Sequence, residues 1–137
     1  MKILNIKDIL SKGLKDESNL SEIEWPVYVV AYFESVADME GWDHFFLYSM
    51  KWYKLLINTL SSTGDHASIR IISDYEKHFK TLGVQFTSAN IDIYLSTAST
   101  DYLDSCPDWR EQFSGACKQR WELIVQHYLE FGIDLKT

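Results

Sequence analysis

The chain contains 137 residues, of which 46% are hydrophobic and 15% aromatic, and its formal net charge is −7. This length suits one compact domain with a sizeable core, and the aromatic content excludes an intrinsically disordered chain. The acidic balance argues against direct binding of nucleic acid, because phosphate groups are bound by clustered basic side chains.

The compartment signals in the sequence indicate a cytoplasmic protein. Charged residues interrupt the apolar ones in the segment 1–14, so we expect no signal peptide. The longest uncharged apolar run, 27–33, is far shorter than the roughly 20 residues of a membrane-spanning helix, so we expect no contact with a membrane. Cys106 and Cys117 form no Cys-x-x-Cys pair and are expected to be free thiols in a reducing compartment.

Helical periodicity begins near the N-terminus. Apolar residues recur there every three or four positions: Ile3, Ile6, Leu10 and Leu14. Gly13 and the polar residues 15–19 are expected to end this first helix. Ser21 and Glu24 fit a capping box and Pro26 suits a first helical turn, so a second helix is predicted to begin among them. Its apolar run could also form a buried strand, but the start signals favour a helix.

The pattern in the middle of the chain predicts a corner followed by two further helices. Gly41 breaks the second helix, and residues 43–49 form a short aromatic element. One helical stripe consists of Trp52, Leu55, Leu56 and Leu60. The next helix has Asp65 as its N-cap and Gly83 just after its end. Its expected buried face consists of Ile71 or Ile72, Tyr75, Phe79 and Leu82.

The last third predicts the longest helix. In residues 91–95, Ile91, Ile93 and Leu95 alternate with Asp92 and Tyr94, as in a short strand. A strand at this place is a minor alternative. The longest helix is expected to start at Pro107 or Asp108 and to end at Gly132. The pattern as a whole predicts an all-α fold, a single compact domain of five or six helices with an aromatic corner at Gly41. We expect 1–137 to be one helical domain, with an N-terminal helix and loop over 1–20 and a core over 21–137.

Negative charge is concentrated in two blocks. Residues 26–50 hold four carboxylates and no Lys or Arg, and residues 81–111 hold five carboxylates against one arginine. A mildly basic segment, 51–80, separates them. Such runs are commonly solvated surface that maintains solubility. The alternative is that spaced carboxylates imitate a phosphate backbone and bind a basic partner.

No pattern in the sequence indicates a cofactor or a metal site. The pairs Glu40/His44 and Asp74/His78 each place an acid and a histidine on one helical face, but a metal would need both pairs to converge. The chain has no Gly-x-Ser-x-Gly elbow and no glycine-rich phosphate loop. We therefore expect no enzymatic activity, no cofactor and no bound metal. The alternative is a small enzyme that uses the carboxylates within 38–43 for acid–base chemistry.

The residues around Gly41 resemble those of a bacterial DNA-mimic-protein-like family of small acidic helical proteins, whose named member is a Neisseria DNA-mimic protein. The resemblance covers residues 34–49 and rests on Glu34, Gly41, Trp42, Phe45 and Phe46. The sequence departs from the family pattern at Glu40, His44 and Tyr48. The resemblance implies an all-helical, non-enzymatic binding protein, because the named member is a dimer whose acidic surface occupies the DNA-binding face of a helix-turn-helix regulator.

We therefore expect a cytoplasmic acidic protein that masks a basic protein surface, either of a DNA-binding regulator or of a toxin to which it confers immunity. The expected contact residues are Glu34, Asp38, Glu40, Asp43, Asp101, Asp104 and Asp108. The aromatic corner is expected to consist of Gly41, Trp42, Phe45 and Phe46. A homodimer is possible. A further alternative is a structural oligomer subunit assembled through Trp42 and Tyr48, because aromatic side chains are enriched at interfaces.

Overall fold

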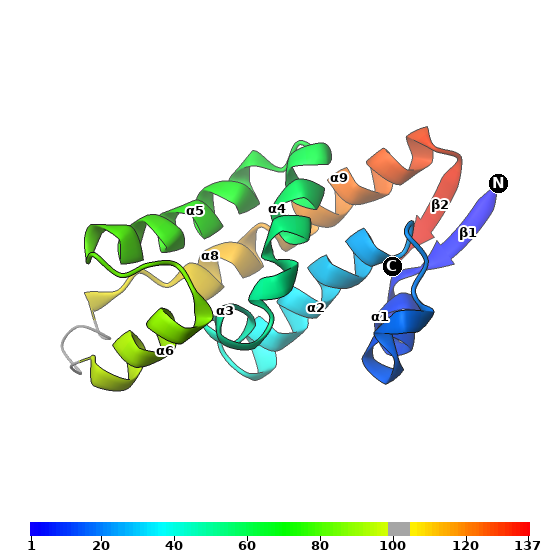
Figure 1. Cartoon of the computed structure of the whole chain (residues 1–137). Coiled ribbons are helices and arrows are strands. Elements are labelled where there is room, and N and C mark those ends of the chain that lie inside the picture. The colour runs from blue at the N-terminus through cyan, green and yellow to red at the C-terminus, as the bar shows by residue number, and fades with distance from the viewer. Residues whose placement is uncertain (99–104) are drawn as a thin grey trace.

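The computed structural model describes residues 1–98 and 105–137, and these ranges contain eight α-helices and two strands (Figure 1). The first half holds β1 (Lys2–Asn5), α1 (Ile6–Lys15), α2 (Trp25–Met39), α3 (His44–Tyr48) and α4 (Tyr53–Ser62). The second half holds α5 (His66–Thr81), α6 (Ser88–Thr97), α8 (Trp109–Gly115), α9 (Cys117–Glu130) and β2 (Ile133–Lys136). The predicted helical character is confirmed, whereas the expected five or six helices were too few.

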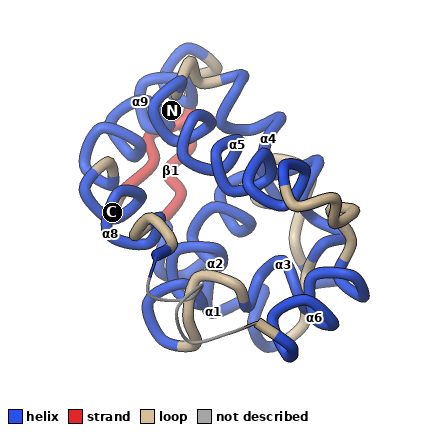
Figure 2. Tube along the Cα trace, turned by 90° about the vertical axis from the view of Figure 1, so that its left-hand side faces the viewer, coloured by secondary structure: helices blue, strands red, loops and turns tan. Residues whose placement is uncertain are grey.

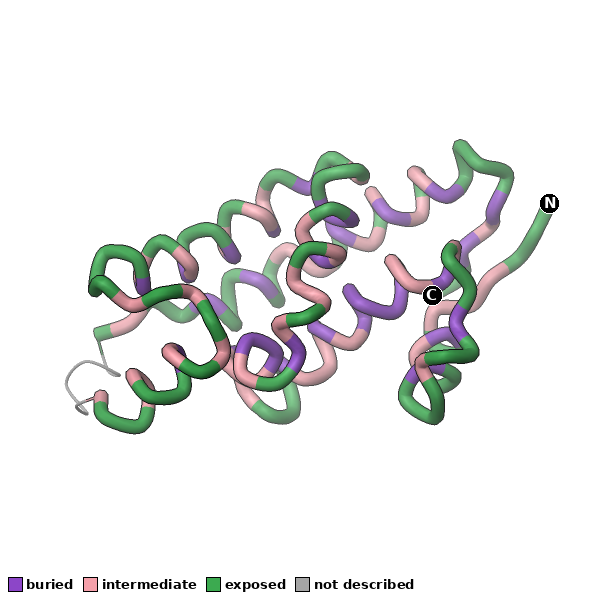
Figure 3. The backbone as a smooth tube through the Cα atoms, in the orientation of Figure 1, coloured by how far each residue is buried: buried purple, intermediate pink, exposed green. Residues whose placement is uncertain are grey.

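Helix α2 is the central element of the fold. It contacts α1, α3, α4 and α8. Buried residues follow its length (Figure 3), and Val27, Val29, Val30 and Phe33 have no exposed surface. The apolar run at its start is therefore a buried helix and not a strand. A helix that is apolar on most sides needs neighbours around it, and the surrounding helices supply them.

The two chain ends form a small parallel sheet, which the all-α prediction lacked (Figure 2). Strand β1 pairs with β2 from Lys2 opposite Ile133 to Asn5 opposite Lys136. In the predicted first helix Ile3 belonged to the buried stripe, but it lies in β1 and is 66% exposed. The error has a physical cause: the backbone of β1 finds its hydrogen-bond partners on β2, at the opposite end of the chain.

Gly13 does not end the first helix as predicted. It lies inside α1 and is buried, with its Cα side facing the Tyr28 ring of α2. A Cβ atom at this position would lie 2.3 Å from Tyr28 Cε1. Gly13 therefore permits the close approach of α1 to α2, and this tertiary contact outweighs its low helix propensity.

Glu24 provides half of the predicted capping box. Its Oε1 accepts a hydrogen bond from the Ser21 backbone N–H at 2.9 Å and one from Lys12 Nζ at 3.0 Å. Burial by itself raises the pKa of Glu24, but these two donors outweigh it and hold the pKa below its ordinary value. The carboxylate thereby joins the end of α1 to the start of α2.

The aromatic corner is confirmed. Gly41 has φ +106°, a backbone conformation that favours glycine, and Trp42, Phe45 and Phe46 are buried beyond it. Their rings meet Phe33 of α2 edge-on, with centroid distances of 5.2, 4.9 and 5.7 Å respectively. The corner therefore locks α3 onto α2 by aromatic packing.

The next two helices follow their predicted signals. The Asp65 carboxylate caps α5 by accepting a hydrogen bond from the Ser68 backbone N–H at 3.0 Å, and Gly83 beyond its end has φ +75°. Leu82 was expected in the core but is 42% exposed. Residues 91–95, the possible strand, lie in helix α6, where Ile91 is buried and Ile93 is 63% exposed.

The predicted longest helix is two helices, α8 and α9, separated at Ala116. In a continuous helix the Phe113 carbonyl would accept a hydrogen bond from the N–H of residue 117. Here it accepts from the Ala116 N–H at 3.2 Å and from Arg120 Nη1 at 3.0 Å. The side chain of Arg120 thus satisfies the carbonyl at the break, and α5 becomes the longest helix of the described residues.

We expect Gly13→Ala to lower the free energy of unfolding by about 1–3 kcal/mol, because the added methyl group overlaps a ring that cannot swing away. Tyr28 is 2% exposed and packs against Trp25, Tyr32 and Trp52. Urea unfolding followed by circular dichroism measures the change. Gly115→Ala is the matched control, because nothing lies within 4 Å of its Cβ position. Equal stability of the two variants would contradict the close helix approach.

Candidate functional site

The two acidic blocks of the sequence meet in space. Arg110, in the first turn of α8, lies with its Nε 3.8 Å from Asp38 Oδ1 at the end of α2. Its Nη2 also donates a hydrogen bond to the Asp38 backbone carbonyl at 3.2 Å. A residue of the second block therefore contacts the first, although they are 72 positions apart in the chain.

We call the surface formed by Asp38, Asp108 and Glu111 around Arg110 the acidic face, and we include Glu40, which lies two residues beyond Asp38 at the C-cap of α2. All five side chains are exposed. Asp38, Asp108, Arg110 and Glu111 line one surface hollow of about 310 Å³. Asp108 also caps α8, since its carboxylate accepts a hydrogen bond from the Glu111 backbone N–H at 3.0 Å. The acidic face thus presents four carboxylates to solvent and one arginine already engaged with α2.

Glu34, an expected contact residue, makes its hydrogen bonds within the fold. Its Oε2 accepts hydrogen bonds from Arg120 Nε at 2.7 Å, and its Oε1 accepts one from Trp121 Nε1 at 2.8 Å. Arg120 Nη2 lies 2.7 Å from the same Oε2. The side chain of Arg120 is 1% exposed, so a buried cation neutralises this carboxylate. Glu34 is therefore not available to bind a partner.

Arg120 is the main residue that sequence reasoning missed. Its Nη1 donates to Ser68 Oγ of α5 and to the Phe113 carbonyl of α8, both at 3.0 Å, and its guanidinium lies 3.7 Å from the centre of the Phe113 ring. Helical periodicity gave no sign of it, because arginine is rarely buried unless it is paired. The available signal was Glu34 in a helix that is otherwise apolar around it.

Cys117 lies beside this ion pair, with its Sγ 3.5 Å from Glu34 Oε2. Burial, and then the negative charge of Glu34, raise the pKa of its thiol. The thiol is therefore protonated at neutral pH, which is unfavourable for a nucleophile.

Asp43 is half-buried beside the acidic face, and its carboxylate is engaged within the fold. It accepts a hydrogen bond from the Tyr75 hydroxyl and lines a hollow of about 160 Å³ with Trp42 and Tyr75, which Asp108 and Arg110 of the acidic face also line. Burial raises the pKa of Asp43, and the hydrogen bond from Tyr75 opposes this shift only in part. The alternative enzyme would use carboxylates among Asp38, Glu40 and Asp43. Asp38 lines other hollows than Asp43 does, so these two carboxylates do not face a common space.

The remaining expected contact residues, Asp101 and Asp104, lie outside the described residues. Within the described ranges no group of three or more His, Cys, Asp or Glu side chains is placed to hold a metal ion. None of the helices described is both long enough and apolar enough to cross a membrane.

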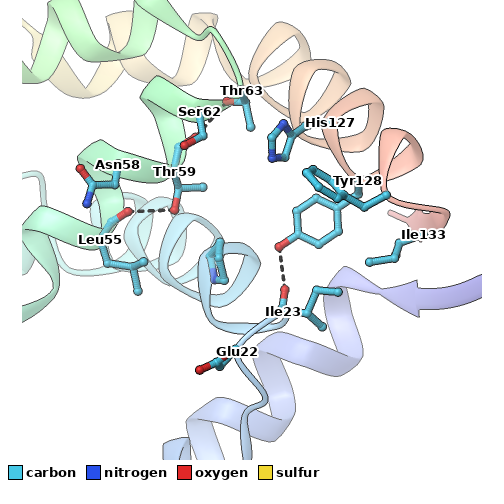
Figure 4. A pocket seen from close by; sticks show the side chains of 12 residues that line it. Glu22, Ile23, Leu55, Asn58, Thr59, Ser62, Thr63, His127, Tyr128 and Ile133 are labelled. Atoms are coloured by element: carbon cyan, nitrogen blue, oxygen red, sulfur yellow. Dashed lines mark hydrogen bonds between the residues drawn. The ribbon is translucent and has the colours of Figure 1, made fainter.

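A further hollow, of about 370 Å³, lies at the beginning of α2, at the end opposite to the acidic face (Figure 4). We call it the apolar pocket. Its floor and walls are formed by Ile23, Pro26, Leu55, Tyr128 and Ile133. Sequence reasoning missed it, because these residues come from four separate segments that only the tertiary structure brings together.

Comparisons of the chain with protein-family models, with curated proteins and with solved structures found no match. The similarity of residues 34–49 to a DNA-mimic-like family therefore stays a prediction. The class that the fold and the site define is a small, mostly helical domain with an exposed acidic face.

We expect Arg120→Met to lower the free energy of unfolding by about 3–5 kcal/mol, because it leaves the Glu34 carboxylate unpaired in a largely buried place. Adding Glu34→Gln should recover part of this loss, since no charge then lacks a partner. Arg110→Met is the control: its ion pair with Asp38 is exposed, and its loss should cost less than about 1 kcal/mol. Urea unfolding measures all three, and similar losses for Arg120→Met and Arg110→Met would contradict the assignment.

Asp43 makes a predictable contribution to the pH dependence of stability. Its pKa in the folded protein is raised above 3.8, so the folded protein keeps this proton where the unfolded chain has lost it. The stabilisation is complete below pH 3.8 and is lost as the pH rises through the folded pKa. The wild type should therefore lose stability relative to Asp43→Asn over this range, as measured by urea unfolding at several pH values. The raised pKa of Asp43 would be contradicted if the difference in stability between the two proteins stays constant with pH or changes in the opposite sense.

Proposed function

We propose that this protein is a non-enzymatic, cytoplasmic binding protein that masks a basic protein surface with its acidic face. The observation that carries the proposal is the contact between Arg110 and Asp38, which joins the two acidic blocks of the chain. The partner would be a basic protein, either a DNA-binding regulator or a toxin whose nucleic-acid site is masked. Direct binding of nucleic acid has no place in the proposal, because the acidic face repels phosphate.

The geometry supports an electrostatic mode of binding. The carboxylates of the acidic face are exposed, and they can attract a basic surface over distances of about a Debye length. Arg110 is held by Asp38 and by its backbone carbonyl, so it does not project toward a partner as an isolated cation. Such a surface gives fast association that weakens as salt increases.

Of the residues expected to bind the partner, the proposal keeps Asp38, Glu40 and Asp108. Glu111 joins them, because it lines the same hollow as Asp38 and Asp108. Glu34 and Asp43 are no longer proposed to bind the partner, since each has its hydrogen-bond partner inside the fold.

The two alternatives receive less support. An enzyme using Asp38 and Asp43 would need both carboxylates in one space, whereas they line separate hollows. An oligomer assembled through Trp42 would need this ring at the surface, whereas it is 8% exposed. Tyr48, at the end of α3 beyond the corner, is 70% exposed and is the aromatic residue through which a homodimer would form.

The variant Asp38→Lys/Glu40→Lys/Glu111→Lys tests the proposal, and it leaves the Asp108 cap intact. We expect it to bind the partner roughly 100-fold more weakly, because three attractive contacts at about 1 kcal/mol each become repulsive or are lost. The measurement is capture of proteins from a lysate of the source organism at low and high salt, followed by titration of the purified basic protein.

The matched control is Asp8→Lys/Glu122→Lys/Glu130→Lys, which changes the net charge equally at exposed positions of α1 and α9. It should keep most of the affinity. Equal capture by both triple variants would show that net charge or another surface mediates binding, and the acidic face would then be rejected. Circular dichroism verifies that each variant is folded.

A further inference from the structure

The apolar pocket lies apart from the acidic face. Ile23 and Pro26 place it at the beginning of α2, whereas Asp38 and Glu40 lie at the end of that helix. The 15 residues of α2 span about 22 Å at 1.5 Å per residue. The pocket therefore needs its own explanation, and its function can be tested separately from that of the acidic face.

Hydrogen bonds within the fold order the residues on each side of the pocket. The Tyr128 hydroxyl donates a hydrogen bond to the Ile23 backbone carbonyl at 2.6 Å, which joins the end of α9 to the segment before α2. On the other side, Thr59 and Thr63 donate their hydroxyl hydrogens to backbone carbonyls within α4. The two walls are thus preformed, as is usual for sites that bind small molecules.

The size of the pocket limits its occupant. Its volume is about 370 Å³, at the lower end of the roughly 300–1,000 Å³ found for small-molecule sites. A cavity of about 150 Å³ lined by apolar side chains accommodates one benzene ring. The pocket therefore has room for a molecule of two to three aromatic rings.

The charges around the pocket limit the occupant further. Among the described residues that line it, the ionisable ones are Glu22, His127 and Tyr128, and none is Lys or Arg. An anionic group would meet no Lys or Arg side chain and would face the Glu22 carboxylate. Glu22 itself is exposed, so it offers only a weak, screened attraction to a cation. These charges favour an uncharged molecule.

One edge of the pocket is polar. Figure 4 shows Ser62 and Thr63 at the end of α4 opposite the His127 ring of α9, with Asn58 one turn earlier on α4. Phe131 lines the same pocket, is 70% exposed and packs against His127 with ring centroids 5.2 Å apart. An occupant with an apolar body and one hydrogen-bonding group would satisfy this edge and cover the exposed Phe131 ring.

From these features we infer that the apolar pocket binds a small uncharged aromatic molecule of two to three rings that carries one hydrogen-bonding group. The class follows from the volume, the absence of Lys and Arg among the described lining residues, and the polar edge formed by α4 and α9. The binding site is independent of the proposed masking function.

A pair of fluorescent probes tests the inference. N-phenyl-naphthylamine is uncharged and carries one N–H group, and anilinonaphthalene sulfonate has the same ring system with an added anion. We expect the uncharged probe to bind saturably, one molecule per chain, with a rise in fluorescence as its rings leave water. The anionic probe should bind at least about tenfold more weakly, because its sulfonate would find no Lys or Arg side chain and would face Glu22.

Two matched pairs of variants test whether the probe binds in the apolar pocket. Ser62→Trp should block the mouth and weaken binding about tenfold or more, whereas Ser61→Trp, an exposed neighbour that does not line the pocket, should not. Phe131→Ala should weaken binding by removing a ring from the rim, whereas Leu129→Ala should not. All four positions are exposed, so the fold should survive, and circular dichroism verifies it.

The inference would be overturned by any of three results: no saturable binding of the uncharged probe, equal binding of the two probes, or equal binding of the uncharged probe to Ser62→Trp and Ser61→Trp. The triple charge variant of the acidic face should bind the uncharged probe as the wild type does. Failure of the inference can therefore be told apart from failure of the proposed function.

Discussion

The buried ion pair between Arg120 and Glu34 connects four helices, and much of the remaining structure depends on its geometry. The guanidinium on α9 reaches Glu34 of α2, Ser68 of α5 and the Phe113 carbonyl of α8. Desolvating an arginine is costly unless every donor finds an acceptor, so these partners must be held in place together. The same contacts allow the break between α8 and α9, and the position of α8 in turn brings Arg110 and its acidic neighbours to the end of α2.

Helix α2 also explains why the molecule offers two different surfaces. Its middle is buried and therefore has no direct role in binding. At its end, α8 supplies charged side chains that line an exposed hollow. At its beginning, residues of α4 and α9 line an apolar hollow together with Ile23 and Pro26. Electrostatic attraction and apolar burial are thus available at opposite ends of one rigid element, where neither interferes with the other.

The parts of the fold that the sequence predicts well are those whose signals are local. The Asp65 cap, Gly83 and the Gly41 corner are set by backbone conformation and by neighbours within a few residues. The errors arise where distant residues decide. Gly13 looks like a helix end but serves the packing of Tyr28, and Ile3 looks helical but lies in a strand that pairs with the other end of the chain. Local propensities are worth a fraction of a kcal/mol per residue, so such tertiary contacts outweigh them.

The sequence by itself determined the helical character, the aromatic corner and the concentration of negative charge in two blocks. Only the tertiary structure decided which carboxylates face solvent: Asp38 and Asp108 do, whereas Glu34 is neutralised by Arg120 and Asp43 is bonded to Tyr75. It also created the apolar pocket from segments that share no pattern. The physical reason is that the exposure and the partners of a side chain depend on which distant elements pack against it, and this information is absent from the spacing of residues along a helix.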